Sequence, residues 1–349
     1  MLKLFSLKAK FTVAAVLLGA ILSSCGGTAD SGSNSQLQRI QDRGVLKCGV
    51  SGELPGFSFI QPDGNYAGLD VDICRAVAAA IFDDPSKVEY RNLNAKERFS
   101  ALQSGEVDIL SRNTTWTLSR DSSNKLSFAP VVFYDGQGMM VRKSSGIQRL
   151  ADFEGKAICT QTGTTTERNL TDQMRKLGVN FNPIVFEDIN LAYTAYTEGR
   201  CEGVTSDRSQ LVSRRSKFPD ASEHVILEEV MSKEPLAPAV NDGDDQWYDV
   251  VKWVIYSTIE AEELGIQSDN LETFSNSNDP VVARFLGQED TLGESLGLSN
   301  DFAARVIKHV GNYGEIYDRN LGPQTPLKLE RGQNQLWSQG GLLYANPFR

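Results

Sequence analysis

The residues with the clearest potential for binding chemistry lie in a polar segment that directly follows an apolar stretch. The segment "SRNTTWTLSRD" (111–121) carries an amide, several hydroxyl groups and Arg120. The guanidinium of Arg120 offers a planar pair of donors that matches a carboxylate, and Asn113 and Thr115 add further polar groups. The segment therefore predicts a site for an anionic group, although a loop that caps a short helix has the same composition.

A second segment combines a glycine turn with three threonines. In "ICTQTGTTTERNL" (158–170), Gly163 precedes Thr164 and Thr165, and Glu167 follows Thr164 at the spacing of a capping box. The N-terminus of a helix also carries unpaired N–H donors and the positive end of the helix dipole, which suits a carboxylate. A structural cap and an anion site are both compatible with these residues.

A third candidate is Asp207, at the end of "EGVTSD" (202–207). Its carboxylate could bind an ammonium group. It could equally cap the helix expected in "RSQLVSRR" (208–215), because aspartate is a preferred N-cap residue.

Signatures of enzymes are nearly absent from the chain. It has two histidines, His224 and His309, and no P-loop, G-x-G-x-x-G, G-x-S-x-G or H-E-x-x-H motif. No cysteine and histidine spacing fits a zinc site. We therefore expect no metal and no cofactor, while acid–base catalysis by distant carboxylates stays open.

The elements that must position these residues alternate between strands and helices. "GVLKCGV" (44–50) reads as a buried strand, "DVDICRAVAAAIF" (70–82) has helical apolar spacing, and residues 95–110 read as a helix and then a strand. This alternation predicts an α/β fold with largely parallel sheets. Residues 99–115 and 193–209 repeat the same order, which suits two lobes that face one cleft.

Two extended segments with Gly or Pro punctuation, 134–146 and 232–247, are expected to cross between the lobes. We expect one lobe to be built from two pieces and the other from the residues between the crossings. The predicted division is 1–24 signal peptide, 25–36 lipidated cysteine and flexible tether, 37–140 first part of lobe 1, 141–236 lobe 2, and 237–349 return to lobe 1 with a C-terminal extension that packs on it.

The N-terminus has the pattern of an export signal. Three lysines precede the apolar run "FTVAAVLLGAIL", which is short for a membrane span, and "LSSC" follows it. This order resembles a bacterial lipobox, in which Cys25 becomes the lipidated N-terminus. An ordinary secretory signal with a chance cysteine is the alternative.

Four cysteines remain besides Cys25, and an even number in an exported chain predicts two disulfides. Three pairings can be drawn, and the spacing favours Cys48 with Cys74 and Cys159 with Cys201. Each pair then lies within one lobe and leaves the connection between lobes free. Four unpaired structural cysteines are the alternative.

The charge balance restricts the partners. The chain has a formal net charge of −10, and removal of the three signal lysines makes it −13. An acidic protein of this kind is a poor match for nucleic acid or for anionic lipid surfaces.

Taken together, the lipobox and a series of motifs resemble the amino-acid-binding proteins of polar ABC transporters, over roughly residues 37–349. The motifs are "LKCGV", "YAGLDVDICRAVA", "ALQSGEVDILSRNTTWTLSR", "FYDGQGMMV", "GTTTE" and "EGVTSD". The segment "SKEPLAPAVNDGDDQWYDVVKWVIYSTIEAEELGI" (232–266) is similar to the branch that serves general L-amino acid uptake.

The resemblance implies a type II periplasmic binding protein, in which two α/β lobes joined by two hinge strands close on a ligand. It implies that Arg120 grips the ligand α-carboxylate, and that Asp207 takes the α-ammonium. It further implies carboxylate contacts from a set of polar residues, namely Asn113, Thr115, Gly163, Thr164 and Thr165.

Two further roles are implied by the same resemblance. Arg98 matches a position that holds a side-chain carboxylate, or it pairs with Glu97 or Asp108. Phe57 matches the loop in which relatives place an aromatic ring over the ligand.

The sequence thus predicts a lipid-anchored, extracytoplasmic, monomeric protein that binds free L-amino acids and delivers them to an ABC permease. It contacts the membrane through Cys25 alone and binds no nucleic acid. Three alternatives stay open: a dehydratase on the same fold, since fold does not fix function, the ligand-sensing domain of a receptor, and a structural lipoprotein.

Overall fold

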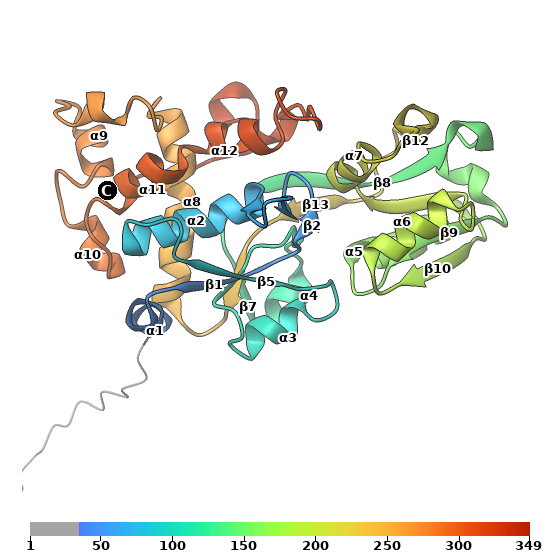
Figure 1. Ribbon diagram of the computed structural model, residues 1–349, viewed down its shortest axis with the longest axis horizontal. Coiled ribbons are helices and arrows are strands. Elements are labelled where there is room, and N and C mark those ends of the chain that lie inside the picture. Colours follow the sequence, from blue (N-terminus) through green and yellow to red (C-terminus); the bar gives the residue numbers. More distant parts are fainter. Residues whose placement is uncertain (1–34) are drawn as a thin grey trace, which may run out of the picture. The chain divides into compact units, whose positions relative to one another are not determined.

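The structure, a computed structural model, describes residues 35–349 (Figure 1). The predicted signal peptide and Cys25 lie outside the described residues. The first lobe is built on a five-stranded sheet in the order β5-β1-β6-β14-β7, in which β1 runs parallel to β5 and β6. Its strands are β1 (Leu46–Val50), β5 (Val88–Asn92), β6 (Ile109–Leu110), β7 (Leu126–Phe128) and β14 (Ala239–Asn241).

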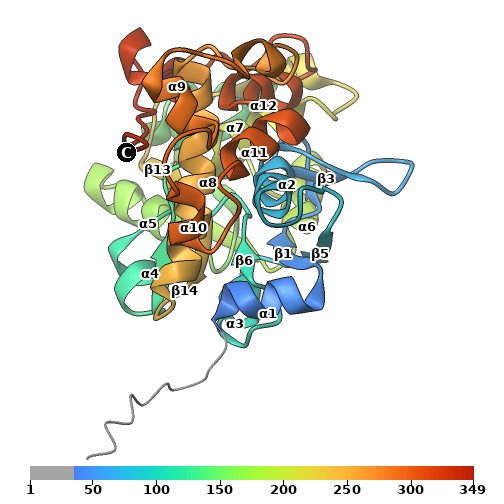
Figure 2. The ribbon, with the colours of Figure 1, turned by 90° about the vertical axis from the view of Figure 1, so that its left-hand side faces the viewer.

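Helices cover this sheet and supply most of the core of the lobe. The predicted helix over 70–82 is confirmed as α2 (Leu69–Phe82), and the predicted strand over 44–50 as β1. Figure 2 shows α2 beside helices from the C-terminal part of the chain, including α8 and α11. The helices outside the second lobe are α1 (Gln36–Arg43), α2, α3 (Arg98–Gln103), α4 (Leu118–Ser122), α8 (Asp245–Glu263), α9 (Pro280–Phe285), α10 (Leu292–Leu296), α11 (Phe302–Val310) and α12 (Tyr313–Asn320). A small sheet adds β2 (Glu53–Leu54), β3 (Ser58–Ile60) and β4 (Tyr66–Ala67).

The second lobe has a separate sheet in the order β10-β9-β11-β8-β12. Its strands are β8 (Phe133–Arg142), β9 (Ala157–Gln161), β10 (Asn182–Phe186), β11 (Gly203–Asp207) and β12 (His224–Ile226). The helices α5 (Thr165–Leu177), α6 (Ile189–Thr197) and α7 (Arg208–Arg215) pack on it. Within residues 35–349, none of the helices has both the length and the hydropathy that crossing a bilayer requires.

Two neighbouring extended segments join the lobes. The first half of β8 pairs antiparallel with β13 (Lys233–Leu236), and its second half pairs with β11 in the second lobe. After β13 the chain enters the first sheet as β14. The connection is therefore a two-stranded ribbon, in which Glu234 lies opposite Asp135 and Pro235 lies opposite Tyr134.

The two disulfides have the pairing that the sequence analysis favours. Cys48 is bonded to Cys74, and Cys159 is bonded to Cys201. The first pair joins β1 to α2, while the second joins β9 to the residue that follows α6 by four positions. Each disulfide therefore lies within a single lobe, the first in lobe 1 and the second in lobe 2, and neither restrains the connecting ribbon.

The C-terminal extension, residues 275–349, packs on the first lobe, and it also holds the start of the connecting ribbon. Its apolar residues, including Phe302 and Phe348, belong to the same core cluster as Cys48 and Cys74. The buried amide of Asn334 accepts a hydrogen bond from the N–H of Tyr134 (2.6 Å) and donates to its carbonyl (3.1 Å). This side-chain amide therefore satisfies both backbone polar groups of Tyr134.

We expect Asn334→Ala to lower the free energy of unfolding by about 1–3 kcal/mol, because the backbone N–H and carbonyl of Tyr134 then lose their side-chain partner in a partly buried setting. The midpoint of urea unfolding measures this change. The matched control is Asn278→Ala, at an exposed position of the same extension, which should change stability by less than about 0.5 kcal/mol. Equal midpoints for the two variants would contradict the role given to Asn334.

Candidate functional site

The polar segments singled out in the sequence meet at a small cavity between the two lobes. They follow the carboxyl ends of β6, β9 and β11, which is where ligands bind in open α/β sheets. The cavity has a volume of about 30 Å³ and is lined from both lobes. Its lining includes six of the predicted ligand-binding residues: Arg98, Asn113, Thr115, Thr164, Thr165 and Asp207.

Arg120 lies beside this cavity and faces its larger neighbour. It lines an adjoining space of about 800 Å³ together with Gly163, Thr164 and Thr165, and its exposed fraction is 7%. Its Nη1 donates to the carbonyl of Thr115 (2.7 Å), and its guanidinium lies 5.2 Å from the centre of the Phe99 ring. Burial lowers the pKa of Arg120 to about 10, against the attraction of Glu234 and Asp207, so the group is charged at neutral pH.

Arg98 lines the cavity itself and lies close to the same ring. Its guanidinium is 4.8 Å from the centre of Phe99, and its Nη1 donates to the hydroxyl of Thr114 (3.3 Å). Its Nε is buried and has no hydrogen-bond partner among residues 35–349. Burial and the neighbouring Arg120 and Arg112 lower the pKa of Arg98.

The alternative that Arg98 pairs with Glu97 or Asp108 is not what the structure shows. The carboxylate of Asp108 accepts from Arg43 and from the N–H of Lys47. Glu97 accepts from the N–H of Asn94. Arg98 therefore pairs with neither carboxylate and lines the cavity.

Asp207 is the residue for which the structure separates the two interpretations most clearly. It occupies the N-cap position of α7, but its side chain makes no capping hydrogen bond. Its exposed fraction is 6%, and its carboxylate lines the cavity. Burial, followed by the repulsion of Asp135 and Glu234, raises the pKa of Asp207 well above its ordinary value. A cation placed beside this carboxylate would be strongly attracted.

The threonine turn forms the predicted cap, with one difference. Thr164 is the N-cap of α5 and accepts from the N–H of Glu167 (3.2 Å), but Glu167 returns its bond to the N–H of Gly163 (3.2 Å) instead of Thr164. The Thr164 hydroxyl donates to the carbonyl of Gln161 (2.6 Å), so its proton is used inside the second lobe. The N–H groups of Thr165 and Thr166, the first two residues of α5, have no acceptor within the helix and are the donors that remain.

Gly163 shows how closely the lobes approach. Its φ is +74°, and a Cβ at this position would lie 3.4 Å from the carbonyl oxygen of Ala95 in the first lobe. A side chain here would be strained by the backbone conformation and crowded by the opposite lobe.

Phe57 is not at the site. Its exposed fraction is 1%, it belongs to the core cluster of the first lobe, and its ring meets the ring of Phe133 edge-on at 5.2 Å. The structure thus contradicts the expectation that Phe57 covers the ligand, because the ring points into the core and away from the cavity.

Two buried residues of the first lobe that the sequence analysis missed position its polar segment. Asp70, at the start of α2, accepts a hydrogen bond from the N–H of Asn113 (3.0 Å), whose φ is +31°. Arg112 donates from Nε to the carbonyl of Leu93 (2.7 Å) and lines the cavity. Burial raises the pKa of Asp70 to about 7, and the nearby Arg112 opposes that shift. The contact between Asp70 and Asn113 joins residues 43 positions apart, so no local sequence pattern predicts it.

A third missed residue is Glu234 on the connecting strand β13. Its carboxylate accepts hydrogen bonds from Thr115 (2.6 Å) and Thr165 (2.9 Å), which belong to different lobes. The segment "SKEPLAPAV" predicts only an extended crossing, and nothing in it indicates which way Glu234 faces.

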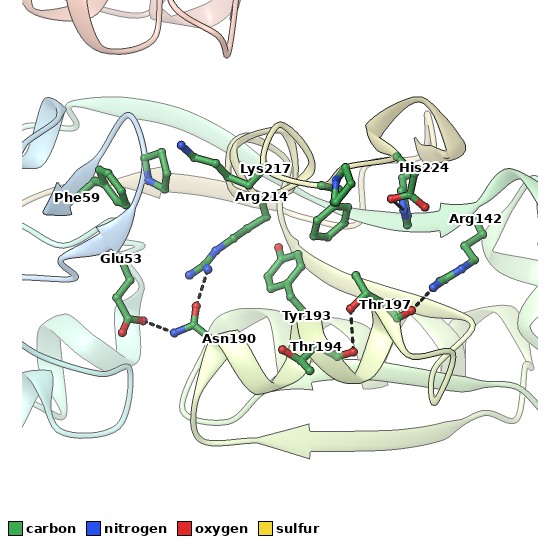
Figure 3. A pocket seen from close by; sticks show the side chains of 14 residues that line it. Glu53, Phe59, Arg142, Asn190, Tyr193, Thr194, Thr197, Arg214, Lys217 and His224 are labelled. Carbon is green, nitrogen blue, oxygen red and sulfur yellow. Dashed lines mark hydrogen bonds and ion pairs between the residues drawn. The ribbon is translucent and has the colours of Figure 1, made fainter. Parts of the chain in front are cut away.

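Direct contacts join the lobes around the cavity. Lys96 pairs with Glu187 (2.7 Å), and Ser213 donates to the carbonyl of Pro55 (2.9 Å). A second groove has a volume of about 570 Å³. Figure 3 shows the side chains that line it, among them Asn190, which donates to Glu53. This hydrogen bond is 3.0 Å long. Neither Arg120 nor Asp207 lines that groove. Because these three contacts join the two lobes directly, the structure represents a closed arrangement.

Residues 35–349 contain no group of three or more His, Cys, Asp or Glu side chains arranged to hold a metal ion. The cavity can form hydrogen bonds and charge interactions. It offers arginine guanidinium groups, hydroxyls, amides and the carboxylate of Asp207, which does not cap its helix. Such a set can hold a small molecule that carries both a carboxylate and an ammonium group.

Comparison with known proteins agrees with this arrangement. The chain is 51% identical over 334 residues to the general L-amino acid-binding periplasmic protein AapJ of Rhizobium johnstonii, covering 95% of this chain and 97% of the relative. It is 46% identical over 322 residues to the glutamate/glutamine/aspartate/asparagine-binding protein BztA of Rhodobacter capsulatus, covering 92% and 95% of the two chains.

Among solved structures, an ABC transporter / periplasmic binding protein from Brucella ovis with glutathione bound superposes with a TM-score of 0.88 at 48% identity, covering 90% of this chain and 99% of that chain. Residues 46–269 match the family of bacterial extracellular solute-binding proteins, family 3. The two-lobed fold, the interlobe cavity and these matches together establish that the chain belongs to this family, with the type II periplasmic binding protein fold.

Proposed function

We propose that this protein captures L-amino acids outside the cytoplasm by closure of its two lobes and delivers them to an ABC permease. The observation that carries the proposal is Asp207, a buried N-cap aspartate whose carboxylate faces the interlobe cavity without capping its helix. A buried carboxylate calls for a cationic partner, and the α-ammonium group of an amino acid supplies one.

The opposite charge of the ligand has its own partners in this proposal. Arg120 would hold the α-carboxylate, with the N–H groups of Thr165 and Thr166 at the start of α5, the amide of Asn113 and the glycine turn at Gly163 nearby. The hydroxyl of Thr115 donates to Glu234 instead. Arg98 would face the ligand side chain. Its Nε without a partner and its position in the cavity support a ligand with polar or acidic side-chain groups.

The relatives support the same recognition of a common head group. One is named for general L-amino acids, one for glutamate, glutamine, aspartate and asparagine, and one structure holds glutathione. Glutathione also carries a free α-ammonium and α-carboxylate, on its γ-glutamyl residue. We therefore propose that the head group is the fixed part of the ligand and that the side chain varies.

Calorimetric titration with all twenty amino acids tests this function. We expect several L-amino acids to bind with one site per chain, and each to be recovered unchanged by mass spectrometry after incubation. Binding without conversion is what the relatives, all named as binding proteins, favour. Conversion of any ligand would overturn the proposal in favour of an enzyme.

We further propose that lobe 1 comprises residues 37–140 and 237–349 and that lobe 2 comprises residues 141–236. Strand β8 spans this boundary, because its second half, from Gln137, already pairs with β11 of the second sheet.

We also propose that the protein acts as a monomer tethered by a lipid on Cys25. The "LSSC" pattern supports the anchor. Cys25→Ala should shift the protein from the membrane fraction to the soluble fraction or block its processing. Unchanged fractionation would rule out an anchor at this residue.

A further inference from the structure

Glu234 makes contacts that no other carboxylate at the site makes. It lies on β13, in the ribbon that joins the lobes, and its exposed fraction is 1%. One carboxylate oxygen accepts from the hydroxyl of Thr115 (2.6 Å) in the first lobe and from that of Thr165 (2.9 Å) in the second. The other oxygen accepts from Asn169 on α5 (2.8 Å) and from the hydroxyl of Ser232.

The direction of these bonds constrains what the two threonines can do. A hydroxyl has one proton to donate, and both protons point at the same oxygen of Glu234. The two hydroxyl oxygens lie 3.5 Å apart across the boundary between the lobes. In the closed arrangement, therefore, these hydroxyls serve an internal carboxylate and cannot donate their protons to a ligand carboxylate at the same time.

We infer that Glu234 is a closure latch, a positioning residue whose carboxylate holds the polar segment of one lobe to the threonine turn of the other. This inference rests on the proposed function, binding by lobe closure, and adds a residue that biases closure before any ligand arrives. Opening the lobes separates Thr115 from Thr165, so Glu234 can then keep only one of the two hydroxyls. Closing restores both bonds to one buried, charged acceptor.

The ion pair between the lobes is a weaker candidate for this role. The ion pair of Lys96 and Glu187 is about two-thirds exposed at both residues (66% and 67%), and exposed pairs contribute little. A buried carboxylate with charge-assisted bonds contributes more, because an open cleft would leave it with fewer partners. Glu234 also attracts the guanidinium of Arg120, so the latch is electrostatically linked to the proposed carboxylate partner.

Small-angle scattering of the ligand-free protein tests the latch without reference to any ligand. We expect Glu234→Ala and Glu234→Gln to increase the radius of gyration relative to wild type, the alanine variant more. Glu187→Gln, which removes an exposed contact between the same lobes, should leave the radius unchanged. A ligand-free radius equal to that of wild type in both Glu234 variants would overturn the inference, and thermal unfolding confirms that each variant is folded.

The affinity for alanine is a second measurement. It distinguishes a latch from a residue that only stabilises the fold. We expect Glu234→Gln to weaken the binding of alanine about 10- to 100-fold. Saturating alanine should return the radius of gyration of this variant to that of the closed protein. Thr165→Val should weaken binding too, and the double variant should be no weaker than the stronger single variant, because both remove the same bond. Additive losses would overturn the latch. If wild type binds no amino acid, the proposed function fails, while the ligand-free scattering still decides the role of Glu234.

Discussion

Arg120→Ala is expected to weaken the binding of alanine about 30- to several-thousand-fold, which corresponds to about 2–5 kcal/mol. Arg120 is almost completely buried, and its remaining donors face the space that also borders Gly163, Thr164 and Thr165. Without it, a ligand carboxylate in the closed cleft would have no charged partner. Calorimetric titration of the variant measures the loss.

Arg120→Lys should recover only part of this loss, because an ammonium group cannot reproduce the planar pair of donors. Arg91→Ala serves as the matched control, since Arg91 is an exposed arginine of the same lobe that pairs with Glu106. Its affinity for alanine should equal that of wild type. If Arg120→Ala binds alanine as tightly as Arg91→Ala does, the proposed position of the carboxylate is wrong.

Asp207→Asn is expected to weaken every α-amino acid by a similar factor, again about 2–5 kcal/mol, whatever the side chain. The amide has nearly the same shape but lacks the charge that attracts an ammonium group. Titration with alanine, leucine and glutamate measures whether the factor is common to all three. A variant that binds alanine like wild type would show that the ammonium lies elsewhere.

The pH dependence of wild type gives a check on the same residue. The pKa of Asp207 is raised in the closed site, and a bound ammonium favours the ionised form. Binding therefore releases a proton, so the affinity should rise as the pH rises through the pKa of Asp207 and fall in acid. Asp207→Asn should lose this dependence, whereas Asp279→Asn, at an N-cap far along the sequence that does cap its helix, should keep it.

The features that the sequence predicted well are those encoded locally. The apolar spacing in residues 70–82 predicted α2, and the spacing of Thr164 and Glu167 predicted the cap of α5. The cysteine pairing also followed from short separations within each lobe.

The features that the sequence missed depend on contacts between distant segments. Glu234 meets Thr115 across 119 positions of the chain, and nothing in the "SKEPLAPAV" segment says that its side chain points into the cleft. The family resemblance places Phe57 over the ligand because it lies in the expected loop. Its partner Phe133, far along the chain, decides instead that the ring enters the core.

Titration of wild type with alanine and with pyruvate tests the central claim most directly. Pyruvate keeps the carboxylate and the methyl group of alanine but has no ammonium, so it can engage Arg120 but not Asp207. We predict that L-alanine binds with one site per chain and that pyruvate binds at least about 30-fold more weakly, the factor expected for loss of one buried charged contact. Equal binding of the two compounds, or no binding of any L-amino acid, would contradict recognition of the amino acid head group between the lobes.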